Sequence, residues 1–220
     1  MKKLSFKEFL KEDSAYRHMV ASYEGKNLDQ EDRNKLPEPS PDNFEGKYRV
    51  GSVYFDNDHG MGAVPDNRNV VYKGFVGMMT PKQFLELAAN HNGQREESAA
   101  DFKQTISEGY PIAAPFLEII LEDIEEGGYA SIVGHEGRAR CLALLSFARE
   151  NQMGLTESSK IPVHFFMRDG LRSRHITDKM IASIKDVGII PEDHKRTNPK
   201  AAEKVKVLKE IYVNGKKIEL

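Results

Sequence analysis

The chain has 220 residues, of which 39% are hydrophobic and 30% are charged, and this composition suits one globular domain with a full core. The formal net charge of -2 excludes a protein that is strongly basic throughout. Charge is uneven, however, because residues 171–220 carry 12 Lys and Arg against 7 Asp and Glu. That segment is either a DNA-binding surface or a solvated basic tail.

The single cysteine, Cys141, excludes an internal disulfide and a cysteine-based zinc site. The N-terminal sequence MKKLSFKEFLKEDS begins like a signal peptide but lacks its apolar run. No stretch approaches the roughly 20 apolar residues of a membrane span. We therefore expect a cytoplasmic protein with no membrane partner.

The first part of the chain predicts a helix, a linker and two strands. Residues 5–24 carry a rough apolar stripe with helical spacing, and residues 25–46 are polar with three prolines. Strands are predicted at Tyr48–Phe55 and Asn69–Met79, where apolar and branched residues recur. Residues 1–46 are thus expected to form an N-terminal helix and linker ahead of the main domain.

Two helices and two strands are predicted next. Thr80 can cap a helix that has Pro81 in its first position, where the missing N–H costs nothing. A second helix is predicted near residues 98–108, and Gly109 ends it. The apolar runs PIAAPFLEIILED and YASIVGH then read as neighbouring strands joined by a tight turn.

The last part predicts alternating elements and a terminal hairpin. Its expected elements are a helix over 137–151, a strand at Ile161–Phe166, helices at Thr177–Val187 and Pro199–Leu208, and a hairpin that turns at Asn214-Gly215. The fold class is therefore mixed α+β. The main domain is expected over residues 47–170, and a small basic helix–hairpin appendage over 171–220.

The junction in YASIVGHEGRARCLALLSFARE places two arginines in the first turn of a helix. The helix dipole is positive there, so Arg138 and Arg140 are each disfavoured by a few tenths to about 1 kcal/mol. Gly134 and Gly137 let the backbone turn and let a ligand approach closely. A phosphate would reverse the penalty, because arginine donates two parallel hydrogen bonds to it. A surface ion pair between Glu136 and the arginines is the alternative.

This region resembles the ParB/sulfiredoxin-like superfamily over roughly residues 69–168. The likeness rests on GYPIAAPFLEIILEDIEEGGYASIVGHEGRARCLALLSFARE and the later strand IPVHFF. Members have a Pro-Ile strand, a short turn, and a second strand that ends in a glycine–arginine motif at a helix start. The upstream MTPKQFLELA is similar to the helix that begins such domains.

The resemblance implies a core whose motif loop binds nucleotide phosphates. The superfamily includes CTP-binding partition proteins, an ATP-dependent cysteine sulfinic acid reductase, a free serine kinase and nucleases. It implies that Gly134, Gly137, Arg138 and Arg140 contact a nucleoside triphosphate, ATP or CTP, bound with Mg²⁺. The spread of the superfamily also fits a phage or mobile-element origin.

Three departures narrow the function that the resemblance implies. Ala139 stands where many relatives have His or Arg, which weakens a catalytic role there. Arg138 occupies the position of the sulfiredoxin cysteine, which disfavours sulfinic acid reduction. The 50 residues after position 170 are too few for the helix-turn-helix domain of partition proteins.

Acidic and histidine side chains near the junction are the catalytic candidates. Glu136 is a candidate Mg²⁺ ligand or base, and His135 a donor to phosphate. Glu118 is a candidate general base, or simply a residue on the solvent face of its strand. Asp56 and Asp58, in YFDNDHGMG, have the residue types of a divalent-cation site, although Asp and Asn clusters also form turns.

The sequence thus favours a nucleotide-binding ParB-like protein that hydrolyses or transfers phosphate, with DNA as one candidate substrate. The alternative is a non-catalytic module that binds a nucleotide or the DNA backbone, or a regulatory protein that has lost the ligand. A core of this size suits a monomer or a homodimer. His164 alternates with Val163 and Phe165, which indicates a packed histidine rather than a ligand.

Overall fold

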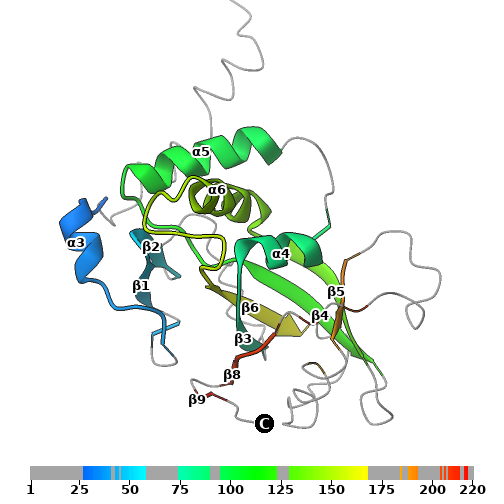
Figure 1. Cartoon of the computed structure of the whole chain (residues 1–220). Coiled ribbons are helices and arrows are strands. Elements are labelled where there is room, and N and C mark those ends of the chain that lie inside the picture. The colour runs from blue at the N-terminus through cyan, green and yellow to red at the C-terminus, as the bar shows by residue number, and fades with distance from the viewer. Residues whose placement is uncertain are drawn as a thin grey trace, which may run out of the picture.

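The structure is a computed structural model, and it describes only part of the chain. The described residues are 27–40, 43–44, 46–57, 74–89, 95–122, 129–167, 184, 188–192, 204, 206, 208–213 and 216–217. The helix expected over 5–24 lies outside them, and the helices expected over 177–187 and 199–208 lie mostly outside them. Over the described residues, the chain has a mixed α+β fold (Figure 1).

A seven-stranded mixed sheet forms the centre of the fold, with the strand order β7-β5-β4-β6-β3-β8-β9. Its strands are β3 (Gly74–Met79), β4 (Phe116–Glu122), β5 (Tyr129–Glu136), β6 (Ile161–Met167), β7 (Ile189–Ile190), β8 (Ile211–Val213) and β9 (Lys216–Lys217). The β4–β6 and β5–β7 pairs are parallel, and the other pairs are antiparallel. The predicted β4–β5 neighbours and the terminal hairpin of β8 and β9 are confirmed.

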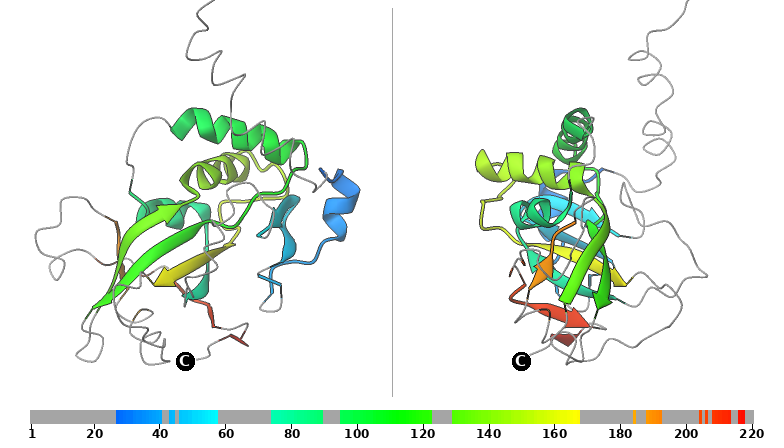
Figure 2. Two further views of the ribbon diagram at one scale, coloured as in Figure 1. Left: turned by 180° about the vertical axis from the view of Figure 1, so that it is seen from behind. Right: turned by 90° about the vertical axis from the view of Figure 1, so that its right-hand side faces the viewer.

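The helices that follow β3 in the chain lie over one face of this sheet, here called the inner face, as Figures 1 and 2 show. The helix α4 (Pro81–Leu87) begins as predicted, because Thr80 and Gln83 form a reciprocal capping box. The helix α6 (Arg138–Arg149) packs on α4, and α5 (Arg95–Ser107) packs on α6. The predicted start of α5, near residue 98, is three residues too late. The helix begins at Arg95, within a polar stretch that the sequence suggested was a break between helices.

A short helix, α3 (Gln30–Lys35), lies in the segment that the sequence predicted to be a linker. Asp29 caps it by accepting a hydrogen bond from the Asp32 N–H. Arg33 is buried and donates from Nη1 to the Ile106 carbonyl at 3.0 Å. The linker prediction is wrong here, because polar composition says nothing about a long-range hydrogen bond.

The predicted strand Tyr48–Phe55 is two strands, β1 (Lys47–Val50) and β2 (Val53–Asp56), which pair with each other. Gly51 turns the chain between them with a φ of +59°. A Cβ at Gly51 would collide with the Met153 carbonyl oxygen, and Ser52 donates its N–H to that oxygen at 2.7 Å. Packing against residues 153–154 therefore dictates a turn that the apolar pattern concealed.

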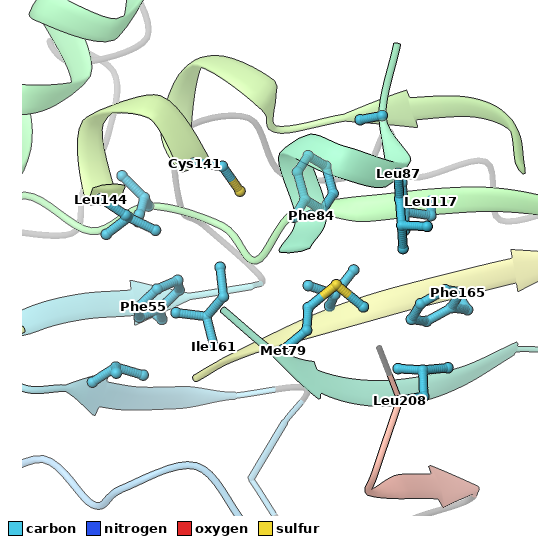
Figure 3. Close-up of a cluster of buried hydrophobic side chains, with 14 of the residues drawn as sticks. Phe55, Met79, Phe84, Leu87, Leu117, Cys141, Leu144, Ile161, Phe165 and Leu208 are labelled. Atoms are coloured by element: carbon cyan, nitrogen blue, oxygen red, sulfur yellow. The ribbon is translucent and has the colours of Figure 1, made fainter. Parts of the chain in front are cut away.

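The core fills the space between the inner face and the helices (Figure 3). Alternate residues of each strand point inward, so that Leu117 and Ile119 are buried while Phe116 and Glu118 are half-exposed on the opposite, outer face. Phe165 stacks on Phe75 with ring centroids 4.6 Å apart. This alternation determines which side chains of β4 and β5 can meet a ligand.

Two leucines of α6 test this arrangement of the core. Leu144 is fully buried, whereas Leu142 is half-exposed on the same helix. We predict that Leu144→Ala lowers the free energy of unfolding by about 2–5 kcal/mol, because it leaves a cavity. Leu142→Ala makes the same change in helix propensity and should cost less than about 1.5 kcal/mol. Equal losses in urea unfolding would contradict the placement of α6.

Candidate functional site

The junction between β5 and α6 is tighter than the loop that the sequence predicted. The strand β5 continues through Glu136, so Gly134 and His135 are strand residues paired with β4. Only Gly137 separates the strand from the helix. Its backbone is left-handed, with φ 107° and ψ 9°, which favours glycine. We call residues 134–140 the junction turn.

A glycine is required at position 137 because a larger residue would clash with its neighbours, as well as because the backbone there is left-handed. A Cβ there would lie 2.5 Å from the Cβ of Pro115 and 2.9 Å from Nη2 of Arg140. Gly137 is also the N-cap of α6, and a glycine has no side chain with which to cap the helix. The first turn of α6 contains no acidic residue. The positive end of the helix dipole is therefore not countered by a cap or an acid of the helix itself.

Arg138 extends from the start of α6 to the end of α4. Its Nη1 donates to the carbonyls of Leu85, at 3.2 Å, and Ala88, at 2.6 Å. A helix C-terminus carries partial negative charge and unpaired carbonyls, which a cation stabilises. The side chain of Arg138 thus stabilises the C-terminal end of α4, although its backbone belongs to α6.

Arg140 is fully buried beneath the junction turn. Its Nη2 lies 3.8 Å from a carboxylate oxygen of Glu136, and its guanidinium lies 5.9 Å from the ring centroid of Phe102. Burial lowers the pKa of Arg140 because the charged form loses solvation. The junction turn therefore contains a buried guanidinium that lies close to Gly137.

His135 points to the inner face and is almost fully buried. Its Nδ1 lies 2.5 Å from Oε2 of Glu192, and the two side chains are 2% and 7% exposed. The Phe84 ring meets the imidazole edge to face at 6.4 Å. The sequence predicted that His135 donates to a phosphate, but the structure places the histidine in a buried pair on the helix side of the sheet.

Glu192 was not among the residues that the sequence singled out. It follows the two-residue strand β7, which pairs with β5. Its Oε2 also accepts the Ala89 N–H at 3.1 Å, and its own N–H donates to the Leu87 carbonyl at 2.8 Å. The one available signal was an acidic residue two positions after the apolar Ile189-Ile190 pair, beyond Pro191.

Glu118 and Gly134 face each other on the outer face of the sheet. They are paired in the β4–β5 ladder, and a Cβ at Gly134 would lie 2.9 Å from a Glu118 carboxylate oxygen. Glu136, with a 56% exposed side chain, lies on the same face, because it is two residues along the strand. Diagonal neighbours of this kind are about 7–8 Å apart. The structure thus brings two carboxylates to the edge of the junction turn.

The predicted metal residues lie apart from this arrangement or outside the described residues. Asp56 is fully buried in the two-stranded sheet, 3.5 Å from Nζ of Lys47 and 3.5 Å from the Tyr54 hydroxyl. Asp58 lies outside the described residues. Where the structure describes side chains, no group of three or more His, Cys, Asp and Glu residues is arranged to hold a metal ion.

Cys141 is a core residue, whereas His164 is a partly buried residue of the outer face, opposite Phe116 in the sheet. Burial raises the pKa of the Cys141 thiol, which keeps it protonated and unreactive. His164 stacks against Phe166 with ring centroids 5.8 Å apart. Its Nε2 is buried and makes no hydrogen bond to any residue that the structure describes. Burial lowers the pKa of His164 to about 4.

Comparison with models of protein families, with curated proteins and with solved structures gives no match for this chain. Among the described helices, none combines the length and the apolar character needed to cross a membrane.

Two glycines test the left-handed junction. We predict that Gly137→Ala lowers the free energy of unfolding by about 2 kcal/mol or more, because the new Cβ meets Pro115 at a positive φ. Gly46→Ala is the control, since the nearest atom to its Cβ is 3.7 Å away and its φ is not positive. Thermal or urea unfolding measures both. Similar values for the two variants would refute the described junction.

His164 should make stability depend on pH. Its folded pKa of about 4 lies below the ordinary 6.5, so the unfolded state takes up the proton first. Stability is then complete above pH 6.5 and falls as the pH drops toward 4, by at most about 1.4 kcal/mol per pH unit.

His164→Phe keeps an aromatic ring but removes the titration. The difference in unfolding free energy between wild type and His164→Phe should be constant above pH 6.5. Below pH 6.5, the wild type should lose stability relative to His164→Phe, because only the wild type has to keep this histidine neutral. A difference that stays constant down to pH 4 would show that the histidine is not buried in a neutral form.

Proposed function

We propose that the protein is a nucleotide-binding protein of the ParB/sulfiredoxin-like type, and that the junction turn holds the phosphates of ATP or CTP. The observation that carries this proposal is a helix N-terminus whose N-cap is a glycine. Gly137 is left-handed and has no side chain to cap α6, and the buried guanidinium of Arg140 lies close to it. These features together favour an anion, and a triphosphate is an anion of high charge.

The backbone is the proposed contact surface for the phosphate. Helix N-termini present N–H groups to anions, and Gly137 adds no side chain that would keep a phosphate at a distance. Arg138 is engaged with the carbonyls at the end of α4, and Arg140 is fully buried. We therefore propose that Arg138 helps to position the turn and that Arg140 attracts the phosphate electrostatically. Neither arginine is proposed to donate two parallel hydrogen bonds to the phosphate, as was expected from the sequence.

The two outer-face carboxylates support a catalytic version of the proposal. Magnesium takes one or two carboxylates together with phosphate oxygens, and Glu118 and Glu136 offer such a pair beside the turn. When bound, Mg²⁺ would neutralise charge that develops during phosphate hydrolysis or transfer. Glu136 is the more exposed carboxylate and is the proposed metal ligand or base.

A non-catalytic binding module is the second candidate. Two observations favour it: Ala139 offers no functional group at the motif, and His135 is turned to the inner face. In this version the same turn binds a nucleotide as a switch, or binds a phosphate of the DNA backbone. The basic segment 171–220 would then add affinity for DNA that depends on salt.

Titration with ATP and CTP, each with and without Mg²⁺, tests the proposal. Calorimetry measures binding, and phosphate release measures turnover. Saturable binding with turnover supports the enzyme, and binding without turnover supports the module. Absence of binding to either nucleotide, with or without the metal, would overturn the proposal.

Glu136→Gln, measured with and without Mg²⁺, distinguishes the electrostatic effect of the carboxylate on the nucleotide from its proposed role as a metal ligand. Without Mg²⁺, we predict that the variant binds the triphosphate about three- to tenfold more tightly, because one negative charge near the turn is gone. With Mg²⁺, it should lose most of the metal-dependent turnover. Glu157→Gln, an exposed carboxylate paired with Arg149, is the matched control and should change neither value.

A further inference from the structure

One residue on each side of Gly137 has a side chain that is linked to the end of α4: Arg138 directly and His135 through Glu192. Arg138, which follows the glycine, donates directly to the carbonyls of Leu85 and Ala88. His135, which precedes it by two residues, reaches α4 through the carboxylate of Glu192. The junction turn is therefore held from both sides by one helix terminus.

Glu192 is the point where three elements meet. Its backbone continues from β7, which runs parallel to β5 with Ile189 opposite Ala130. Its N–H donates to the Leu87 carbonyl of α4 at 2.8 Å. Its Oε2 lies 3.1 Å from the Ala89 nitrogen and 2.5 Å from Nδ1 of His135 in β5.

The burial of Glu192 makes this arrangement costly to disturb. Its side chain is 7% exposed, so the carboxylate has given up most of its water in exchange for these partners. Without the carboxylate, the Ala89 N–H and the His135 imidazole would be left in a buried place without that acceptor. Burying a polar group without an acceptor is costly, because the group has already given up its hydrogen bonds to water.

The contact between His135 and Glu192 also restrains the end of β5. Successive residues of a strand point to opposite faces, so Gly134 and Glu136 face outward where His135 faces inward. Without Glu192, the side chain of His135 would no longer tie this end of the strand to α4. The backbone of Glu136, Gly137 and the first turn of α6 would then be less restrained.

We infer that Glu192 is a positioning residue of the junction turn. The inference rests on the proposed function in one respect, namely that the turn binds a nucleotide. Glu192 lies on the inner face and acts through His135 and α4. The segment 188–192 thereby controls nucleotide affinity from the side of the sheet opposite to Glu118 and Glu136.

Three variants test this inference: Glu192→Ala, Glu192→Gln and Glu210→Ala. Glutamine keeps an oxygen that can accept the Ala89 N–H, so it should rescue much of what alanine loses. Glu210 is a matched control, because its carboxylate is 35% exposed and lies 3.7 Å from Lys160, which precedes β6. All three are made in the full chain.

Hydrogen exchange without nucleotide is the first measurement. Glu192→Ala should accelerate exchange at least tenfold in peptides covering 85–89 and 134–141, and leave 161–167 near the wild-type rate. Glu192→Gln should stay within about threefold of wild type. Glu210→Ala should leave 134–141 unchanged. Unchanged exchange at 134–141 in Glu192→Ala, or equal acceleration everywhere, would overturn the inference.

Binding of ATP and CTP with Mg²⁺ is the second measurement. Glu192→Ala should weaken the affinity of whichever nucleotide the wild type binds by at least tenfold, with partial recovery in Glu192→Gln. Equal affinity of wild type and Glu192→Ala would also overturn the inference. If the wild type binds neither nucleotide, the proposed function fails by itself, and the exchange rates still decide whether Glu192 holds the turn.

Discussion

The bond between Arg138 and the end of α4 connects the parts of this structure. A guanidinium at the start of α6 is electrostatically misplaced with respect to its own helix and well placed with respect to another. It joins the positive end of α6 to the negative end of α4, and the two helices pack together over the inner face. Because Arg138 directly follows Gly137, the contact also ties the end of β5 to α4.

Local signals in the sequence predicted the elements whose cause is local. The Thr80 capping box, the branched runs of β4 and β5, and the apolar face of α6 are all visible within a few residues. The signals failed where distant residues decide. Gly51 turns because residues 153–154 occupy the space beside it, and α3 is held by a carbonyl more than seventy residues away.

The candidate site shows the same division. Sequence reasoning correctly brought Glu118 near the glycine-rich junction, because strand pairing is a regular arrangement. It could not predict that Arg138 turns to α4 or that Arg140 is buried, since a helix start has several possible directions for a long side chain. Glu192 escaped notice because the residues it joins are dispersed over the chain, and no local pattern marks a residue that links them.

The contact between Glu192 and Ala89 spans 103 positions of the chain, which has a consequence for synthesis on the ribosome. When α4, β4, β5 and α6 have emerged, the partner that fixes His135 has not yet been made. The core is still incomplete at that stage, because its residues in β6 and in later segments have not yet emerged. The end of β5 acquires its contact with Glu192 only after residue 192 leaves the exit tunnel, so this support of the junction turn forms late.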